Sequence, residues 1–249
     1  MFKVQRKHIN GAKTKEAGFT LVELMIALFV SGLVMAAVVS VYTAQTRSYS
    51  QQDDIADIQQ NLRGALAILP MEIRLAGCDP EESKAPGVLE ATRTRFRFTM
   101  DIRGNAATQN SGDGDVDDPG ENIAFGFANG IDANNNGIVD NGGADWSNTA
   151  SLGRHTGSGA LSLMPLAGNI EALEFNYILN NGVTSLAPAN LNDIRAVQVS
   201  ILARTSNPAQ NFVHTGTYTT ASGAEWNPPQ DTFRRRLVIT TIQCRNMGL

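Results

Sequence analysis

The longest apolar stretch of the chain lies near its N-terminus and carries one charge. Residues 18–39 read GFTLVELMIALFVSGLVMAAVV, and Glu23 is the only charged side chain among them. The 24 residues from Phe19 to Tyr42 would form a helix of roughly 36 Å, which is long enough to cross the hydrocarbon core of a bilayer. The pattern therefore predicts a membrane-spanning helix.

The charges around this stretch predict its orientation and a partner for Glu23. Five basic residues and one acid precede it, so the positive-inside rule places the N-terminus in the cytoplasm and everything after Tyr42 outside it. The basic residues are Lys3, Arg6, Lys7, Lys13 and Lys15. A charged side chain costs at least ~2.5 kcal/mol near the centre of a bilayer. No residue of the span can pair with Glu23, so we expect its partner to come from elsewhere.

A second helical pattern follows the apolar stretch. Residues 43–54 are polar and contain no helix breaker, and from residue 55 apolar residues recur at every third or fourth position, as in a helix with one buried face. Pro70 lacks a backbone donor, so a kink or the end of the helix is expected near Leu69, with Gly77 and Pro80 marking the stop. The apolar stripe comprises Ile55, Ile58, Leu62, Leu66, Leu69 and Ile73.

Alternating apolar and polar residues predict strands in the remainder of the chain. The clearest runs lie at 95–102, 173–179, 194–204 and 234–244, and weaker runs lie at 123–127 and 161–164. A helix followed by strands predicts an α+β fold, in which the second half of a long N-terminal helix packs on an antiparallel β-sheet.

Residues 105–159 are rich in Asn, Gly and Asp and poor in apolar side chains, which predicts a long surface insertion. Part of it alternates oxygen-bearing side chains around a glycine, a pattern suited to the hard cation Ca²⁺. The alternative is a cluster of turns whose side chains cap their own backbone. The candidate calcium ligands are Asp132, Asn134, Asn136, Asp140 and Asp145, and a weaker candidate site comprises Asp113, Asp115 and Asp117.

Cysteine content and charge add two further expectations. Cys78 and Cys244 are the only cysteines; in an oxidising compartment they could form a disulfide worth ~4 kcal/mol in the chain-entropy model, or they could be two separately buried thiols. Without residues 1–18 the chain has 15 basic and 23 acidic residues, a net charge near −8. This balance argues against nucleic-acid binding, which needs a basic surface.

The N-terminal motif resembles a known processing signal. The run GFTLVELMIA, from Gly18 onward, resembles the prepilin motif of type IV pilins. The resemblance implies that a membrane prepilin peptidase cuts between Gly18 and Phe19 and N-methylates Phe19. It further implies that Glu23 meets the cationic terminal amine of a neighbouring subunit, so that assembly pairs the buried charge. An ordinary single-pass anchor is the alternative.

Three segments of the head resemble the PilW family of minor pilins, namely residues 62–77, 194–204 and 234–246. The resemblance implies a low-abundance subunit that primes pilus assembly and sits at the tip with other minor pilins and a large adhesin. Before assembly the subunit would reside in the inner membrane with its head in the periplasm, and afterwards in the pilus at the cell surface. A type II secretion minor pseudopilin and a membrane-anchored extracytoplasmic binding protein are the alternatives.

These inferences divide the chain into four parts and give no sign of an enzyme. We expect a leader over 1–18, a membrane or filament-core helix over 19–42, its amphipathic continuation over 43–76, and a β-rich head over 77–249 with the insertion at 105–159. His155 and His214 belong to no metal or nucleophile motif, and His155 is expected to be solvated. The run from Arg234 to Arg236 predicts an exposed strand entrance, or else a contact with an acidic neighbouring subunit.

Overall fold

The computed structural model describes residues 18–248 except 84, 105–111, 141 and 158. Most of the predicted leader therefore lies outside the described residues. The chain divides into two compact units, Met1–Ser48 and Tyr49–Leu249, and each is considered by itself below.

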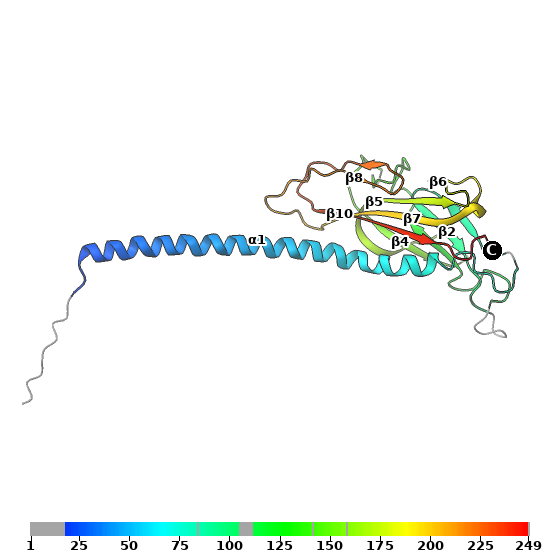
Figure 1. Ribbon diagram of the computed structural model, residues 1–249, viewed down its shortest axis with the longest axis horizontal. Coiled ribbons are helices and arrows are strands. Elements are labelled where there is room, and N and C mark those ends of the chain that lie inside the picture. The colour runs from blue at the N-terminus through cyan, green and yellow to red at the C-terminus, as the bar shows by residue number, and fades with distance from the viewer. Residues whose placement is uncertain (1–17, 84, 105–111, 141, 158, 249) are drawn as a thin grey trace, which may run out of the picture. The chain divides into compact units, whose positions relative to one another are not determined.

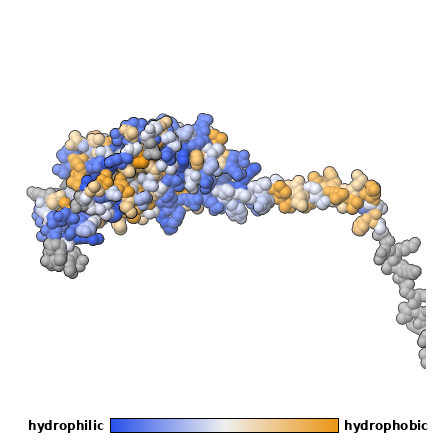
Figure 2. All heavy atoms as spheres, turned by 180° about the vertical axis from the view of Figure 1, so that it is seen from behind, coloured by the Kyte–Doolittle hydropathy of each residue, from blue (hydrophilic) through white to orange (hydrophobic). Residues whose placement is uncertain are grey.

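The described part of the first unit is an apolar stretch of helix. Helix α1 spans Leu21–Ile73, and its N-terminal part is long and apolar enough to cross a membrane, with a mean hydropathy of 2.6 over an 18-residue window. Every described residue up to Ser48 is exposed, and these side chains form the apolar surface of the helix in Figure 2. Such a surface needs lipid or other helices to cover it.

The second unit contains the C-terminal part of α1, which buries one face. Ile58, Leu62, Leu69 and Ile73 of the predicted stripe are buried, whereas Ile55 is 46% exposed. The helix continues past Pro70 to Ile73, so of the kink or end expected near Leu69 the end does not occur. Pro70 lies in the last turn, where only one intrahelical bond is lost, and burial of the residues on either side holds the turn in place.

The head is built on one antiparallel sheet whose spatial order is β1-β2-β3-β4-β5-β7-β10, with β6 paired to part of β5 (Figure 1). The α+β fold predicted from the sequence is confirmed. The strands are β1 (Val88–Ala91), β2 (Arg95–Thr99), β3 (Asn122–Gly126), β4 (Ala150–Thr156), β5 (Met164–Leu179), β6 (Thr184–Ser185), β7 (Ile194–Arg204) and β10 (Arg235–Gln243), with a 3-10 turn η1 (Leu191–Asp193) before β7.

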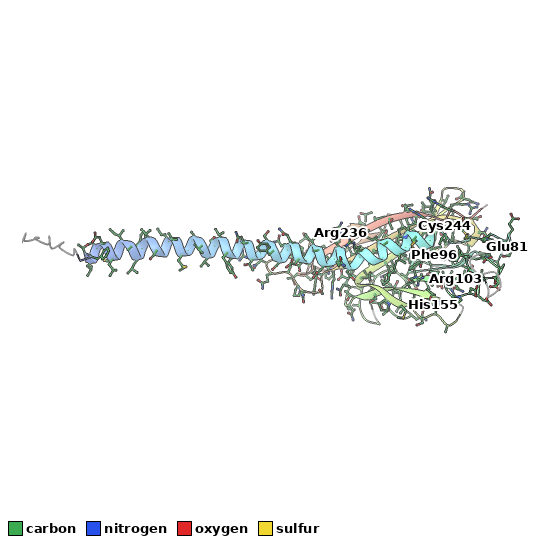
Figure 3. The ribbon with its side chains drawn as sticks, turned by 90° about the horizontal axis from the view of Figure 1, so that it is seen from below. Glu81, Phe96, Arg103, His155, Arg236 and Cys244 are labelled. Atoms are coloured by element: carbon green, nitrogen blue, oxygen red, sulfur yellow. The ribbon has the colours of Figure 1, made fainter. Side chains whose placement is uncertain are left out.

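Two apolar cores lie on the two faces of this sheet. The larger core joins the buried face of α1 to the sheet and includes a cluster of tilted aromatic rings around Phe96, with Phe98, Phe175 and Tyr177 at centroid distances of 5.2–6.3 Å (Figure 3). The smaller core comprises Ala172 on β5, Leu202 on β7 and Trp226, which lies in a ribbon of β8 (Tyr218–Thr219) and β9 (Glu225–Trp226). Since α1 covers only one face, this ribbon supplies apolar cover for the other.

The segment 105–159 is more than a surface insertion, because it provides strands β3 and β4 to the middle of the sheet. Ile123, Phe125 and Leu152 are fully buried. Strand β4 has little apolar alternation, and its pairing with β5 is interrupted by two register shifts. The alternating pattern that predicts a strand is therefore missing from its sequence. The predicted strand at 161–164 contributes only Met164, the first residue of β5.

Candidate assembly site

The predicted cleavage and methylation residues lie immediately before helix α1. Gly18 and Phe19 are exposed and non-helical, and no atom lies within 4 Å of the position that a Cβ on Gly18 would occupy. Phe19 is 92% exposed. The peptide bond between them is therefore open to a protease, because backbone that is exposed and free of secondary structure is the preferred substrate for cleavage.

Thr20 and Glu23 form a capping box at the start of α1. Thr20 donates its backbone N–H (2.9 Å) and its hydroxyl (3.0 Å) to Glu23 Oε2, and Glu23 donates its N–H to Thr20 Oγ1 (3.2 Å). Two backbone donors of the first turn are thereby satisfied within the chain. The spacing Thr-x-x-Glu is itself a sequence signature of a capping box.

This capping box corrects the prediction that Glu23 has no partner within its own span. The donors from Thr20 are neutral, however, so they leave the negative charge of Glu23 uncompensated. A carboxylate held by two hydrogen bonds still has lone pairs that can accept from a cation. The arrangement thus fixes the position of the carboxylate and leaves its charge available to a partner.

The loop after Ile131 is organised by the oxygens that were predicted to bind calcium. Asp132 accepts from the N–H groups of Asn136 (3.1 Å) and Gly137 (2.9 Å), while Asp140 accepts from Ala133 and Gly142. Burial raises the pKa of Asp132, although its backbone hydrogen bonds act in the opposite direction. Gly137 has φ +87°, and a Cβ there would lie 2.8 Å from the Leu173 carbonyl oxygen, so this position requires glycine.

Three of the other calcium candidates, Asn134, Asn136 and Asp145, contact one another. Asp145 accepts side-chain amide hydrogens from Asn134 (2.9 Å) and Asn136 (2.6 Å), so this candidate ligand does join the loop. Within the described ranges, no three His, Cys, Asp or Glu side chains form a ready-made metal cluster. At the weaker candidate, Asp115 accepts from the N–H of Asp117 (3.2 Å), and together with Asp113 these are acidic turn residues.

Cys78 and Cys244 are free thiols in the structure, which is the second of the two arrangements expected from the sequence. Cys244 is buried in the larger core, and burial raises its thiol pKa to about 12. Cys78 is half-buried, and burial together with Asp101 and Asp79 raises its pKa. Burial therefore favours the protonated thiol at both positions.

The prediction of a solvated His155 is wrong, and the prediction of an exposed run from Arg234 to Arg236 is wrong at Arg235. His155 is 5% exposed; its Nδ1 accepts the N–H of Ser162 (3.0 Å) and its Nε2 lies 2.9 Å from the Gly157 carbonyl oxygen (Figure 3). The side chain of Arg235 is fully buried, although its neighbours Arg234 and Arg236 are not. A polar sequence environment misled both predictions, because the partners of these side chains are supplied by the fold.

Arg235 is the centre of a buried ionic network at the start of β10. It donates to both carboxylate oxygens of Asp231 (2.7 and 2.6 Å) and to Glu171 on β5, which also accepts from Arg204 on β7 (3.1 Å). Although burial acts to lower the Arg235 pKa, the two carboxylates hold it above its ordinary value. These ion pairs link β5, β7 and β10 to Asp231, which lies near the end of the connection between β7 and β10.

Comparisons with known proteins give one family match near the N-terminus and another in the C-terminal half of the chain. The family described as type IV pilus-assembly protein W, PilW, matches residues 138–246, and the prokaryotic N-terminal methylation motif matches residues 13–39. Among solved structures, a type IV-like pilin from Thermus thermophilus aligns with a TM-score of 0.45 and 16% identity over 76% of this chain and 97% of that chain. Comparison with curated proteins gave no match. The methylation-motif match includes Gly18, Phe19 and Glu23, and the PilW match begins at Ile138, within the calcium-candidate loop, and extends past the end of β10.

Proposed function

We propose a priming role at the filament tip for this chain, which is a PilW-like member of the type IV pilin superfamily and a minor pilin for pilus assembly. The match to the methylation motif carries the assignment, because it includes the exposed residues Gly18 and Phe19 and the first apolar turns of α1. The PilW match over the head supports a minor rather than a major subunit. A tip adhesin would be a further partner.

Maturation is proposed to follow the prepilin route. A membrane prepilin peptidase would cut between Gly18 and Phe19 and methylate the new amine of Phe19. The exposed, non-helical backbone on both sides of this bond supports the assignment. Before assembly the apolar part of α1 would lie in the inner membrane, with the N-terminus cytoplasmic and the head periplasmic, as the basic residues before Gly18 favour.

Glu23 is proposed to pair with the terminal amine of a neighbouring subunit. The capping box holds its carboxylate at the start of α1 without neutralising it. A cationic amine brought by another subunit would offset the cost of keeping this charge among apolar side chains. Charge pairing would then occur only between subunits, which links it to assembly.

Calcium is proposed as a ligand of the loop from Asp132 to Asp145. The support is chemical: Asp132 accepts hydrogen bonds at the turn around Gly137, Asn134 and Asn136 contact Asp145, and oxygen-bearing side chains of this kind suit Ca²⁺. Binding would require Asp145 to exchange its amide donors for the cation. The weaker candidate at Asp113, Asp115 and Asp117 stays a second proposal of the same kind.

The test of the proposed function is deletion of the gene in its host, with surface filaments counted by electron microscopy and secreted proteins assayed in the medium. Loss of filaments with normal secretion is the expected result. Loss of secretion with intact filaments would assign the chain to a secretion pseudopilus. No change in either would favour a membrane-anchored binding protein.

A further inference from the structure

Strand β10 is an edge of the sheet, and its free side is regular. At one end Thr205 donates its N–H to the Arg234 carbonyl, and at the other Cys244 donates to the Arg195 carbonyl, both at 2.9 Å. The register between these points is unshifted. Hydrogen-bonded and outward-pointing residues alternate in an antiparallel pair, so the odd-numbered residues direct their N–H and C=O away from β7. They are Arg235, Leu237, Ile239, Thr241 and Gln243.

Within the described part of the chain, none of these outward backbone groups has a hydrogen-bond partner. Natural sheets usually protect such an edge with charges, proline, a bulge or a very short strand. Residues 237–242 read LVITTI and contain none of these features. The opposite edge, β1, has four residues and a register shift beside Glu90. Of the two edges of this sheet that the structure describes, β10 therefore presents the longer template for another strand, unprotected over residues 237–242.

A groove runs beside this edge, between β10 and the C-terminal part of α1. It has a volume of about 740 Å³ and is lined by Gln59, Arg63 and Leu66 of the helix and by Arg236 and Val238 of the strand. Figure 3 shows Arg236 on β10 beside α1. Both arginines are exposed, and neither forms an ion pair with any described residue. The groove thus combines apolar side chains with two uncompensated positive charges.

We propose that the free edge of β10 and the adjoining groove bind an extended, acid-bearing segment of another pilus subunit, which adds a strand to the sheet. Backbone hydrogen bonds to the outward groups would supply affinity, and acidic side chains that reach Arg63 and Arg236 would supply selectivity. A second copy of β10 is a poor occupant, because the strand RRLVITTIQ contains no acid and brings two more arginines. The inference rests on the proposed function, since the partner is a pilus subunit.

The test is site-specific photocrosslinking of the full-length protein in host cells. The photoreactive residue p-benzoylphenylalanine replaces Ile239, which is 45% exposed on β10; the matched control replaces Leu89, which is 50% exposed on the opposite edge. Ultraviolet light should give an adduct from position 239 and not from position 89. Mass spectrometry should map it to an acid-bearing, extended segment of another pilus protein.

Charge reversal completes the test. Arg63→Glu combined with Arg236→Glu should lower the adduct yield at least about tenfold, and the milder pair Arg63→Gln with Arg236→Gln should lower it less; tryptophan fluorescence checks that each variant is folded. Absence of an adduct, an adduct with a second copy of this chain, or a yield unchanged by both pairs would overturn the interface. If filaments require the gene while position 239 gives no adduct, the interface alone fails; if filaments do not require the gene, the proposed function fails.

Discussion

Replacing Glu171 with Gln should destabilise the head far more than replacing any exposed carboxylate. Glu171 is fully buried and accepts hydrogen bonds from Arg204 and from Arg235, whose side chain is also fully buried. Gln keeps the size and one acceptor oxygen but removes the charge, which leaves Asp231 as the single anion for two cations. Breaking a buried pair costs about 3–5 kcal/mol, and because Gln retains one acceptor we expect about 3 kcal/mol.

The assay is equilibrium unfolding in urea, followed by tryptophan fluorescence. Both tryptophans, Trp146 and Trp226, lie in the second unit, so the signal reports on the head even when the full-length protein is held in detergent. Glu90→Gln is the matched control, because Glu90 lies 3.6 Å from Arg95 in a partly exposed pair that should contribute less than about 1 kcal/mol. If the two variants lose equal stability, the buried network does not stabilise the junction of β5, β7 and β10 as argued.

Four further results are expected. Gly18→Ala should leave the precursor uncut, and mature-sized protein on an immunoblot would contradict the cleavage assignment. Glu23→Gln should preserve the capping box, since Gln also fits that motif, and yet should lower the amount of subunit in sheared filaments as strongly as Glu23→Ala; wild-type incorporation of the Gln variant would show that the charge is dispensable. Burial raises the Asp231 pKa, but hydrogen bonds and charge from Arg235 outweigh it and hold the pKa below 3.8. The stability that this lowered pKa contributes is complete above about pH 4 and is lost as the pH falls through the folded-state pKa. Asp231→Asn should therefore make the free energy of unfolding fall less steeply at acid pH. Calcium at 100 times its dissociation constant should stabilise the head by about 2.7 kcal/mol, and Asp132→Ala with Asp140→Ala should abolish the rise in melting temperature; equal melting curves with calcium and with chelator would exclude the site.

Periodic apolar patterns made most of the architecture readable from the sequence. The stripe from Ile58 to Ile73 and the alternation around Phe96 each reflect burial of one face, so they predicted a helix on a sheet. Strand β4 was missed because its small and polar residues owe their burial to neighbouring strands. The polar interior was equally hidden, since Arg235 and Glu171 are 64 positions apart and neither residue carries a local signal of the other.

The sequence predicted the residues of the N-terminal motif and those of the calcium-candidate loop to different degrees. Gly18, Phe19 and Glu23 belong to one contiguous motif, so their sequence order is also their spatial order, and the family match covers them. The role of Thr20 as cap emerged only from the geometry. The calcium candidates lie in a loop whose contacts are local, which is why the grouping of Asp145 with Asn134 and Asn136 could be anticipated from spacing.

The position of β10 in the chain has a consequence for the time at which the head can fold. This strand follows every other strand that the structure describes, yet it pairs along its whole length with β7, supplies Ile242 to the larger core and provides Arg235 to the ionic network. Until β10 has been synthesised, Glu171 has no Arg235 to meet and the groove beside α1 lacks one wall. The head can therefore complete its sheet only after β10 has been made, and a subunit truncated before β10 would lack both the ionic network and the groove.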